Sequence, residues 1–89
     1  MHYTFDPAKN RRNRDRHGVD LADAVRVFDE THIEWEDDRY DYGERRFIVL
    51  GSIDARIYVV VYTWRNGFRR IISARWANSR ERDVFHRHT

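Results

Sequence analysis

The chain has 89 residues and a mass of 10.9 kDa, which suffices for one domain and not for two. It contains no cysteine, which excludes a disulfide framework, a thiolate nucleophile and a cysteine-ligated zinc site. The formal net charge is only +2, and no apolar run approaches the length of a membrane span. No charged-then-apolar leader opens the sequence, so we expect a cytoplasmic protein.

The N-terminal segment predicts a short strand followed by a helix. His2–Phe5 is the expected strand, after which Asp6 provides an N-cap and Pro7 suits the first helical position. The helix should run to about His17 and end at Gly18, because glycine readily adopts the left-handed conformation that ends many helices. Its face carries few apolar residues, so we expect it to lie on the surface.

A second helix is better marked. Asp20 can act as its N-cap. One buried stripe, with the spacing i, i+3, i+4, i+7, is formed by Leu21, Ala24, Val25 and Phe28. Thr31–Glu36 is then expected to be a strand.

From residue 46 onward the pattern predicts a meander of three strands. They are expected near Arg46–Leu50, Arg56–Trp64 and Phe68–Ser73. A loop at Gly51–Ala55 separates the first two, and Asn66-Gly67 between the last two favours a type I′ hairpin turn. Because both faces of residues 57–62 are apolar, that strand should be central and covered by helices.

The Asn66-Gly67 turn also determines which side chains share a face of the hairpin. With these two residues as the loop, Thr63 pairs with Arg70, and side chains alternate between the faces. One face then carries Arg65, Thr63 and Arg70, and the other carries Trp64, Arg69, Tyr62 and Ser73.

The last part of the chain returns to helix. Asn78 and Glu81 resemble a capping box, and Val84-Phe85 could anchor the last turn to the core. His86–Thr89 is expected to fray. The whole pattern predicts one α+β domain over residues 1–89, with an antiparallel sheet meander, two N-terminal helices and one C-terminal helix.

Arginine dominates the basic residues, and Lys9 is the sole lysine. A guanidinium binds phosphate bidentately and stacks on bases, although a genome rich in G and C would explain the bias equally well. Arg65, Arg70 and Arg75 form the sharpest group, because three guanidiniums near one point could bind a phosphate and stabilise a phosphoryl-transfer transition state. The alternative is a solvated hairpin tip bound to local carboxylates.

Four further residues each have two interpretations. Trp64 and Arg69 form a cation–π pair, or the ring stacks on a base. His17 interacts with the C-terminus of its helix, or it carries protons near neutral pH. Glu44 neutralises one of the two arginines that follow it, or it acts as a general base toward a ribose 2′-hydroxyl.

Charge is unevenly distributed along the chain. Lys9–Arg16 and Arg65–Arg82 are basic, whereas Asp29–Asp41 is acidic. The acidic segment is either a solvated edge or a docking surface for a basic partner. No metal site is expected, because His86 and His88 are two residues apart and would not converge in a helix.

Five motifs occur in a fixed order along the chain. They are Phe5-Asp6-Pro7-Ala8-Lys9, His17-Gly18-Val19-Asp20, Asp41-Tyr42-Gly43-Glu44-Arg45-Arg46, Val61-Tyr62-Thr63-Trp64-Arg65 and Arg70-Ile71-Ile72-Ser73-Ala74-Arg75. In sequence and spacing they resemble the BrnT family, the toxin half of the BrnT/BrnA type II toxin–antitoxin systems. The resemblance covers nearly the whole chain.

The resemblance implies a RelE-like α+β fold and a metal-independent endoribonuclease, with no cofactor, that cleaves messenger RNA and arrests growth. It also implies a BrnA antitoxin, a ribbon-helix-helix protein that neutralises the toxin and binds operator DNA in the complex. The matching positions are the basic Lys9, Arg65, Arg70 and Arg75 and the titratable Glu44 and His17. Further candidates are Arg12, Arg69 and Trp64 for RNA binding and Asp37 and Asp38 for antitoxin binding.

Two functions follow as hypotheses. In the first, the three arginines hold the scissile phosphate while Glu44 or His17 takes the proton from the 2′-hydroxyl, with most of the acceleration from in-line positioning and charge stabilisation. In the alternative, the protein is not catalytic and binds its antitoxin and DNA as a co-repressor. It would then leave RNA intact.

Overall fold

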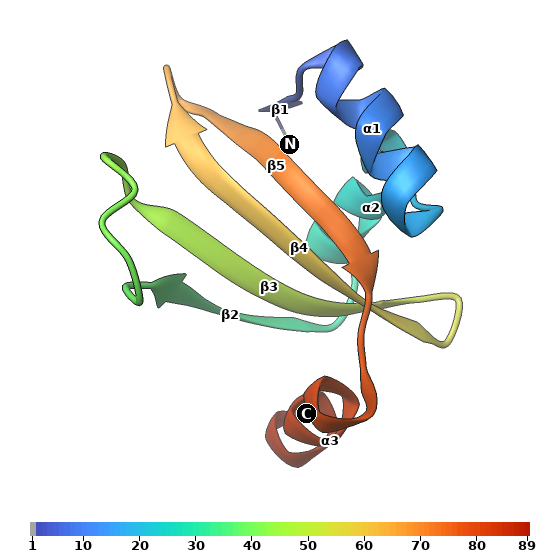
Figure 1. Ribbon diagram of the computed structural model, residues 1–89. Helices are drawn as coiled ribbons and strands as arrows, with labels where there is room; N and C mark the ends of the chain where they lie inside the picture. The colour runs from blue at the N-terminus through green and yellow to red at the C-terminus, as the bar shows by residue number, and fades with distance from the viewer. Residues whose placement is uncertain (1) are drawn as a thin grey trace.

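The computed structural model describes residues 2–89, which form a five-stranded sheet flanked by helices (Figure 1). The strands are β1 (Tyr3–Thr4), β2 (His32–Asp37), β3 (Arg46–Ile53), β4 (Arg56–Arg65) and β5 (Phe68–Trp76). The helices are α1 (Pro7–His17), α2 (Leu21–Ala24), the 3₁₀ helix η1 (Val25–Asp29) and α3 (Ser79–His88). The order across the sheet is β1-β5-β4-β3-β2, with β1 parallel to β5 and all other neighbours antiparallel. The α+β class predicted from the sequence is confirmed.

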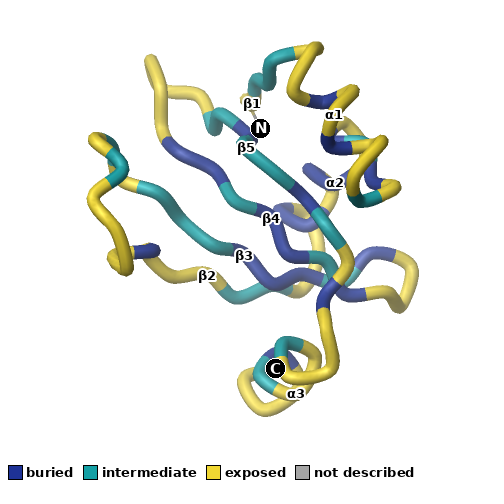
Figure 2. Tube along the Cα trace, in the orientation of Figure 1, coloured by how far each residue is buried: buried dark blue, intermediate teal, exposed yellow. Residues whose placement is uncertain are grey.

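β4 lies in the middle of the sheet, as its apolar sequence predicted. Its side chains alternate between a first face, which carries Val60 and Tyr62, and a second face, which carries Val59 and Val61. α1, α2 and η1 lie on the first face, whereas α3 covers only one end of the second (Figures 1 and 2). Part of the second face therefore stays open.

α1 is attached to the sheet by polar contacts rather than by an apolar stripe. The buried Asn13 amide donates to the carbonyl oxygens of Val19 and Ala74, both at 2.8 Å, and accepts from the Ala74 N–H at 3.2 Å. Asn10, also buried, accepts from the Leu21 N–H at 2.8 Å. Because buried backbone groups require hydrogen-bond partners, these two asparagines fix α1 against β5 and α2.

The helix ends predicted from the sequence are confirmed. Asp6 accepts a hydrogen bond from the first turn of α1, and Gly18 ends that helix with φ +71°. Asn78 and Glu81 form the reciprocal capping box of α3. The second predicted helix is short, because the chain changes to 3₁₀ geometry at Val25, although its four stripe residues are all buried. None of the helices within residues 2–89 is long and apolar enough to cross a membrane.

Several element boundaries differ from the prediction, and β5 in particular runs to Trp76 instead of ending near Ser73. β3 continues through Gly51 to Ile53, and the turn into β4 consists of Asp54-Ala55, which have φ values of 51° and 65°. Gly51 is required for close packing instead, since an added Cβ would lie 2.7 Å from the Cβ of Val27. α3 remains helical to His88, where fraying was expected.

An irregularity in β5 decides which residues reach the second face. Tyr62 pairs with Ile71, whereas the preceding Val61 pairs with Ser73. Ile72 is therefore an extra residue in the ladder, a β-bulge. The prediction that Ser73 shares a face with Tyr62 was wrong, because strict alternation is interrupted at this bulge.

Candidate functional site

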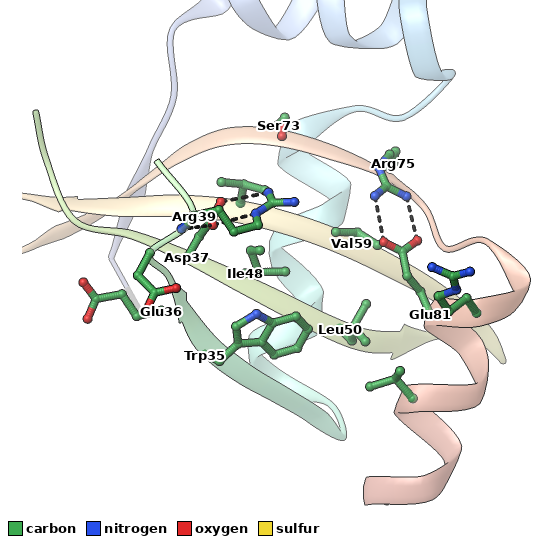
Figure 3. A pocket seen from close by; sticks show the side chains of 14 residues that line it. Trp35, Glu36, Asp37, Arg39, Ile48, Leu50, Val59, Ser73, Arg75 and Glu81 are labelled. Carbon is green, nitrogen blue, oxygen red and sulfur yellow. Dashed lines mark hydrogen bonds and ion pairs between the residues drawn. The ribbon is translucent and has the colours of Figure 1, made fainter. Parts of the chain in front are cut away.

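The second face of the sheet carries a groove of about 470 Å³ beside α3 (Figure 3). Its apolar floor is formed by Ile48, Leu50, Val59 and Val61. Trp35 of β2 and Val84 of α3 also line it. The groove exists because α3 covers only one end of this face, so apolar strand residues stay accessible next to charged ones.

Two ion pairs flank the groove. Arg39 donates to both oxygens of Asp37, at 2.8 and 3.0 Å, and the Tyr42 hydroxyl donates to the same carboxylate at 2.8 Å. The Arg39 hydrogen bond in particular holds the pKa of Asp37 far below its usual range, against the effect of burial. Across the floor, Arg75 of β5 donates to both oxygens of Glu81 at 2.8 Å (Figure 3). This contact raises the pKa of Arg75 and lowers that of Glu81.

A second depression, of about 380 Å³, lies between α1 and β5, and we call it the basic hollow. It is lined by Lys9, Arg12, Asn13, Arg16, His17, Ile72 and Ser73. Residues 9, 12 and 16 gather there because their spacing places them on one side of α1.

The charges of the basic hollow are not compensated. In the part of the chain that the structure describes, none of its four basic side chains is paired with a carboxylate. Ser73 lines both the basic hollow and the groove, so the two depressions adjoin at β5. An extended anionic ligand could therefore contact both.

Glu44 lies next to the basic strands, as predicted. One of its oxygens accepts from Arg46 at 3.3 Å and the other accepts from Arg65 at 3.4 Å. Arg45 pairs with Glu36 instead, at 2.8 Å. The Glu44 carboxylate thus bridges the start of β3 and the end of β4.

Arg65, Arg70 and Arg75 share the second face but do not surround one point. Arg70 lies opposite Thr63, which confirms the predicted hairpin register, and Arg65 is two residues further along β4. Arg75 lies opposite Val59, four residues from Thr63, which is about 13 Å at about 3.3 Å per residue. The three arginines therefore form a row, in which only the first two are neighbours.

Arg69 and Trp64 lie on the first face, away from the other predicted RNA-binding residues. The Arg69 guanidinium is 4.8 Å from the centre of the Trp64 ring, 4.3 Å from that of Phe28 and 5.3 Å from that of Tyr62. The predicted cation–π pair is confirmed. The four RNA-binding candidates are consequently divided: Lys9 and Arg12 line the basic hollow, whereas Arg69 and Trp64 do not.

The two acidic candidates differ in exposure. Asp37 is 7% exposed and lies inside its ion pair with Arg39, whereas Asp38 is exposed. Only Asp38 is therefore free to meet a partner without the loss of an internal contact. Among residues 2–89, no three His, Cys, Asp or Glu side chains are grouped where they could hold a metal ion.

Three residues of these depressions were missed in the sequence. Arg16 could have been found, because it repeats the helical spacing of Lys9 and Arg12. Trp35 could also have been found, since it alternates with Asp37 along β2 and so shares its face. No sequence signal predicted the position of Ser73, which depends on the bulge.

A small α+β domain with an accessible sheet face and uncompensated basic residues beside it has the electrostatic character expected of a polyanion-binding surface. Residues 5–81 match the family model described as the ribonuclease toxin, BrnT, of type II toxin–antitoxin systems. The chain belongs to this family, which confirms the resemblance drawn from the five motifs. A search of curated proteins finds no match. The chain is therefore a ribonuclease toxin of a type II toxin–antitoxin system, and such a system includes an antitoxin partner.

Proposed function

We propose that this protein cleaves messenger RNA without a metal ion, by attack of a ribose 2′-hydroxyl on the adjacent phosphate. The observation that carries the proposal is the basic hollow, in which Lys9, Arg12, Arg16 and His17 have no carboxylate partner within residues 2–89. Cations already paired with acids offer little to a phosphate, whereas unpaired ones release bound counterions when RNA replaces them. An open depression also suits a polymer that lies across the surface.

The chemistry requires no group that the chain lacks. The 2′-oxygen bonds to the neighbouring phosphorus while the bond from phosphorus to the 5′-oxygen breaks, which leaves a 2′,3′-cyclic phosphate and a 5′-hydroxyl. A base removes the 2′-hydroxyl proton and an acid protonates the leaving oxygen. Guanidiniums stabilise the additional negative charge on the phosphorane, and Arg70, which shares the face of β5 with Ser73 and has no carboxylate partner within residues 2–89, is the candidate for this role.

His17 is the better supported proton carrier of the two candidates. It is the histidine of the basic hollow, and its side chain has no hydrogen-bond partner among the described residues. Glu44 is engaged by Arg46 and Arg65, which supports a role in holding those arginines. We therefore expect His17→Gln to lower the cleavage rate more than Glu44→Gln, and the reverse order would exchange the two roles.

The test of the mechanism is cleavage by purified protein in excess EDTA. RNA should still be cut and should carry a 2′,3′-cyclic phosphate or its 3′-phosphate hydrolysis product. A substrate with a 2′-deoxy sugar at the scissile position should resist. Cutting of that substrate, or loss of activity that magnesium restores, would contradict the mechanism.

The test of the surface uses variants of α1. Arg12→Ala and Arg16→Ala should each weaken RNA binding. Each should also reduce the slope of log affinity against log salt concentration by about one in magnitude. Arg11→Ala removes the same charge from the same helix outside the basic hollow and is the matched control. In growing bacteria, Arg65→Ala or Arg70→Ala should relieve the growth arrest that the wild-type toxin causes.

We further propose that the antitoxin is a BrnA-like ribbon-helix-helix protein and that the chain meets operator DNA only in that complex, in the cytoplasm. The alternative, a non-catalytic co-repressor, is favoured by the engagement of Arg65 with Glu44 and of Arg75 with Glu81. Purified protein that binds the antitoxin and leaves RNA intact would favour this alternative.

A further inference from the structure

We propose that the groove on the second face binds an unpaired nucleobase, which stacks on Trp35 while the adjoining phosphate lies in the basic hollow. The inference rests on the proposed function, because it takes RNA as the ligand. It assigns the groove a task that the arginines do not have, namely contact with a base.

Trp35 is the one tryptophan among residues 2–89 on whose ring no guanidinium stacks. Its side chain lies on the second face opposite Ile48, and the residue is 43% exposed. Trp64 and Trp76 are exposed to a similar extent, but the Arg69 guanidinium stacks on the first ring and the Arg56 guanidinium on the second, at 4.0 Å from its centre. Within residues 2–89, no aromatic ring or guanidinium stacks on Trp35.

The groove has the composition of a site for a planar ligand. Its volume of about 470 Å³ lies within the range of small-ligand pockets, and its floor is apolar with a few polar groups at the rim. Stacking on an exposed aromatic ring is the common way in which proteins hold unpaired bases. Trp35 also lines a shallower depression with Ile33, Val84 and His88, so a base can approach the ring from the edge of the sheet.

The rim charges favour a base over a phosphate in the groove. The rim contains the Asp37–Arg39 and Arg75–Glu81 pairs together with Glu36, Asp38 and Arg80, so four carboxylates face three guanidiniums and disfavour a phosphate. The edge of a base has both donors and acceptors and suits such a mixed rim. The basic hollow contains no carboxylate and suits the phosphate. Because Ser73 belongs to both depressions, neighbouring parts of one RNA strand can occupy them together.

The experiment measures binding rather than cleavage, with a short RNA that carries 2′-deoxy sugars throughout its central positions. In a Trp64→Phe, Trp76→Phe protein, Trp35 is the only tryptophan, so quenching of its fluorescence reports on the groove. Trp35→Leu should weaken binding of the RNA by about 5- to 150-fold, the range for loss of one stacked base. Trp35→Phe should weaken it by much less, because a ring remains.

Trp76→Leu is the matched control, since Trp76 is 46% exposed but pairs with Tyr58 on the first face. Unchanged affinity of Trp35→Leu, or loss of antitoxin binding without loss of RNA binding, would overturn the proposal and assign the groove to a protein partner. Absence of quenching by all four nucleoside monophosphates and by the RNA would overturn it as well. RNA binding and quenching without any cleavage of normal RNA would instead contradict the proposed function and leave the base site supported.

Discussion

The Glu81 carboxylate holds the Arg75 guanidinium through two hydrogen bonds of 2.8 Å, and this contact joins α3 to β5. One of the same oxygens accepts from the Asn78 backbone N–H at 2.9 Å and completes the capping box of α3. One side chain therefore starts the last helix and neutralises an arginine of the groove. RNA that approaches Arg75 must compete with Glu81.

Glu81→Gln should separate these two tasks, because glutamine retains the capping geometry but not the charge. We expect affinity for uncleavable RNA to rise about fivefold, which corresponds to roughly 1 kcal/mol, and binding to become more sensitive to salt. Filter binding at two salt concentrations measures both effects. Glu30→Gln, an exposed acid at the end of η1, is the control. Equal affinities of the two variants would remove Arg75 from the RNA-binding surface.

Asn13→Ala should destabilise the protein by about 2–4 kcal/mol, because it leaves the buried N–H and C=O groups of Ala74 without their partner. The free energy of unfolding in urea measures the effect. Arg11→Ala also introduces an alanine, but on the exposed side of α1, and should alter the free energy of unfolding by less than about 0.5 kcal/mol. Similar values for the two variants would show that α1 is not fixed by this asparagine.

Gly51→Ala should cost about 1–3 kcal/mol of stability, since its Cβ would approach the Cβ of Val27 to 2.7 Å and β3 or η1 would have to move. Ser52→Ala, at the next position of the same strand, is the control and should have a smaller effect. The midpoints of thermal unfolding compare the two. A Gly51→Ala protein as stable as wild type would mean that η1 lies further from the sheet.

Acid should destabilise the protein through Asp37. Its pKa is lowered in the folded state, chiefly by Arg39, so its contribution is present above the unfolded pKa and is lost as the pH falls below about 4. Asp37→Asn should therefore be less stable than wild type at pH 7 and should lose less stability between pH 5 and pH 3. Urea unfolding at several pH values across this range measures how steeply the free energy of unfolding changes with pH. Asp38→Asn, an exposed neighbour, should retain the slope of wild type.

Antitoxin association should depend on the exposed acids after β2. Reversal of charge at Asp38 and Asp41 should lower the association rate and weaken its salt dependence, because such charges steer encounter. Asp37 is left intact, since its removal would break the pair with Arg39. Asp15→Lys combined with Asp23→Lys, on α1 and α2, controls for net charge. Stopped-flow rates at low salt that match those of the control would exclude the acidic segment from the interface.

Local signals predicted most of the fold. The caps at Asp6 and Gly18 and the Asn66-Gly67 turn each act over a few residues, so the sequence alone was sufficient to find them. Gly51 was misread, because a glycine that permits a turn and a glycine that permits close packing look alike until the packing partner is known. That partner, Val27, is distant in the sequence.

The candidate site was less predictable for the same reason. Lys9 and Arg12 of α1 were selected from the sequence, but the neutralisation of Arg75 by Glu81 depends on where α3 docks after β5 ends. Arg65, Arg70 and Arg75 form a row that was mistaken for a cluster. The residue types indicate which chemistry is possible, but they do not give the distances between the side chains. Distances along the sheet required the register of β4 and β5.

The bulge at Ile72 also makes the site sensitive to the register of β5. If Ile72 paired with Val61 instead of bulging, strict alternation would return, and Ser73 and Arg75 would then point to the first face, into the core beneath α1 and α2. Every residue of the basic hollow and of the groove would still be present in such a protein. A comparison of related toxins by residue identity alone would therefore score as intact a protein in which a straightened β5 had removed the site.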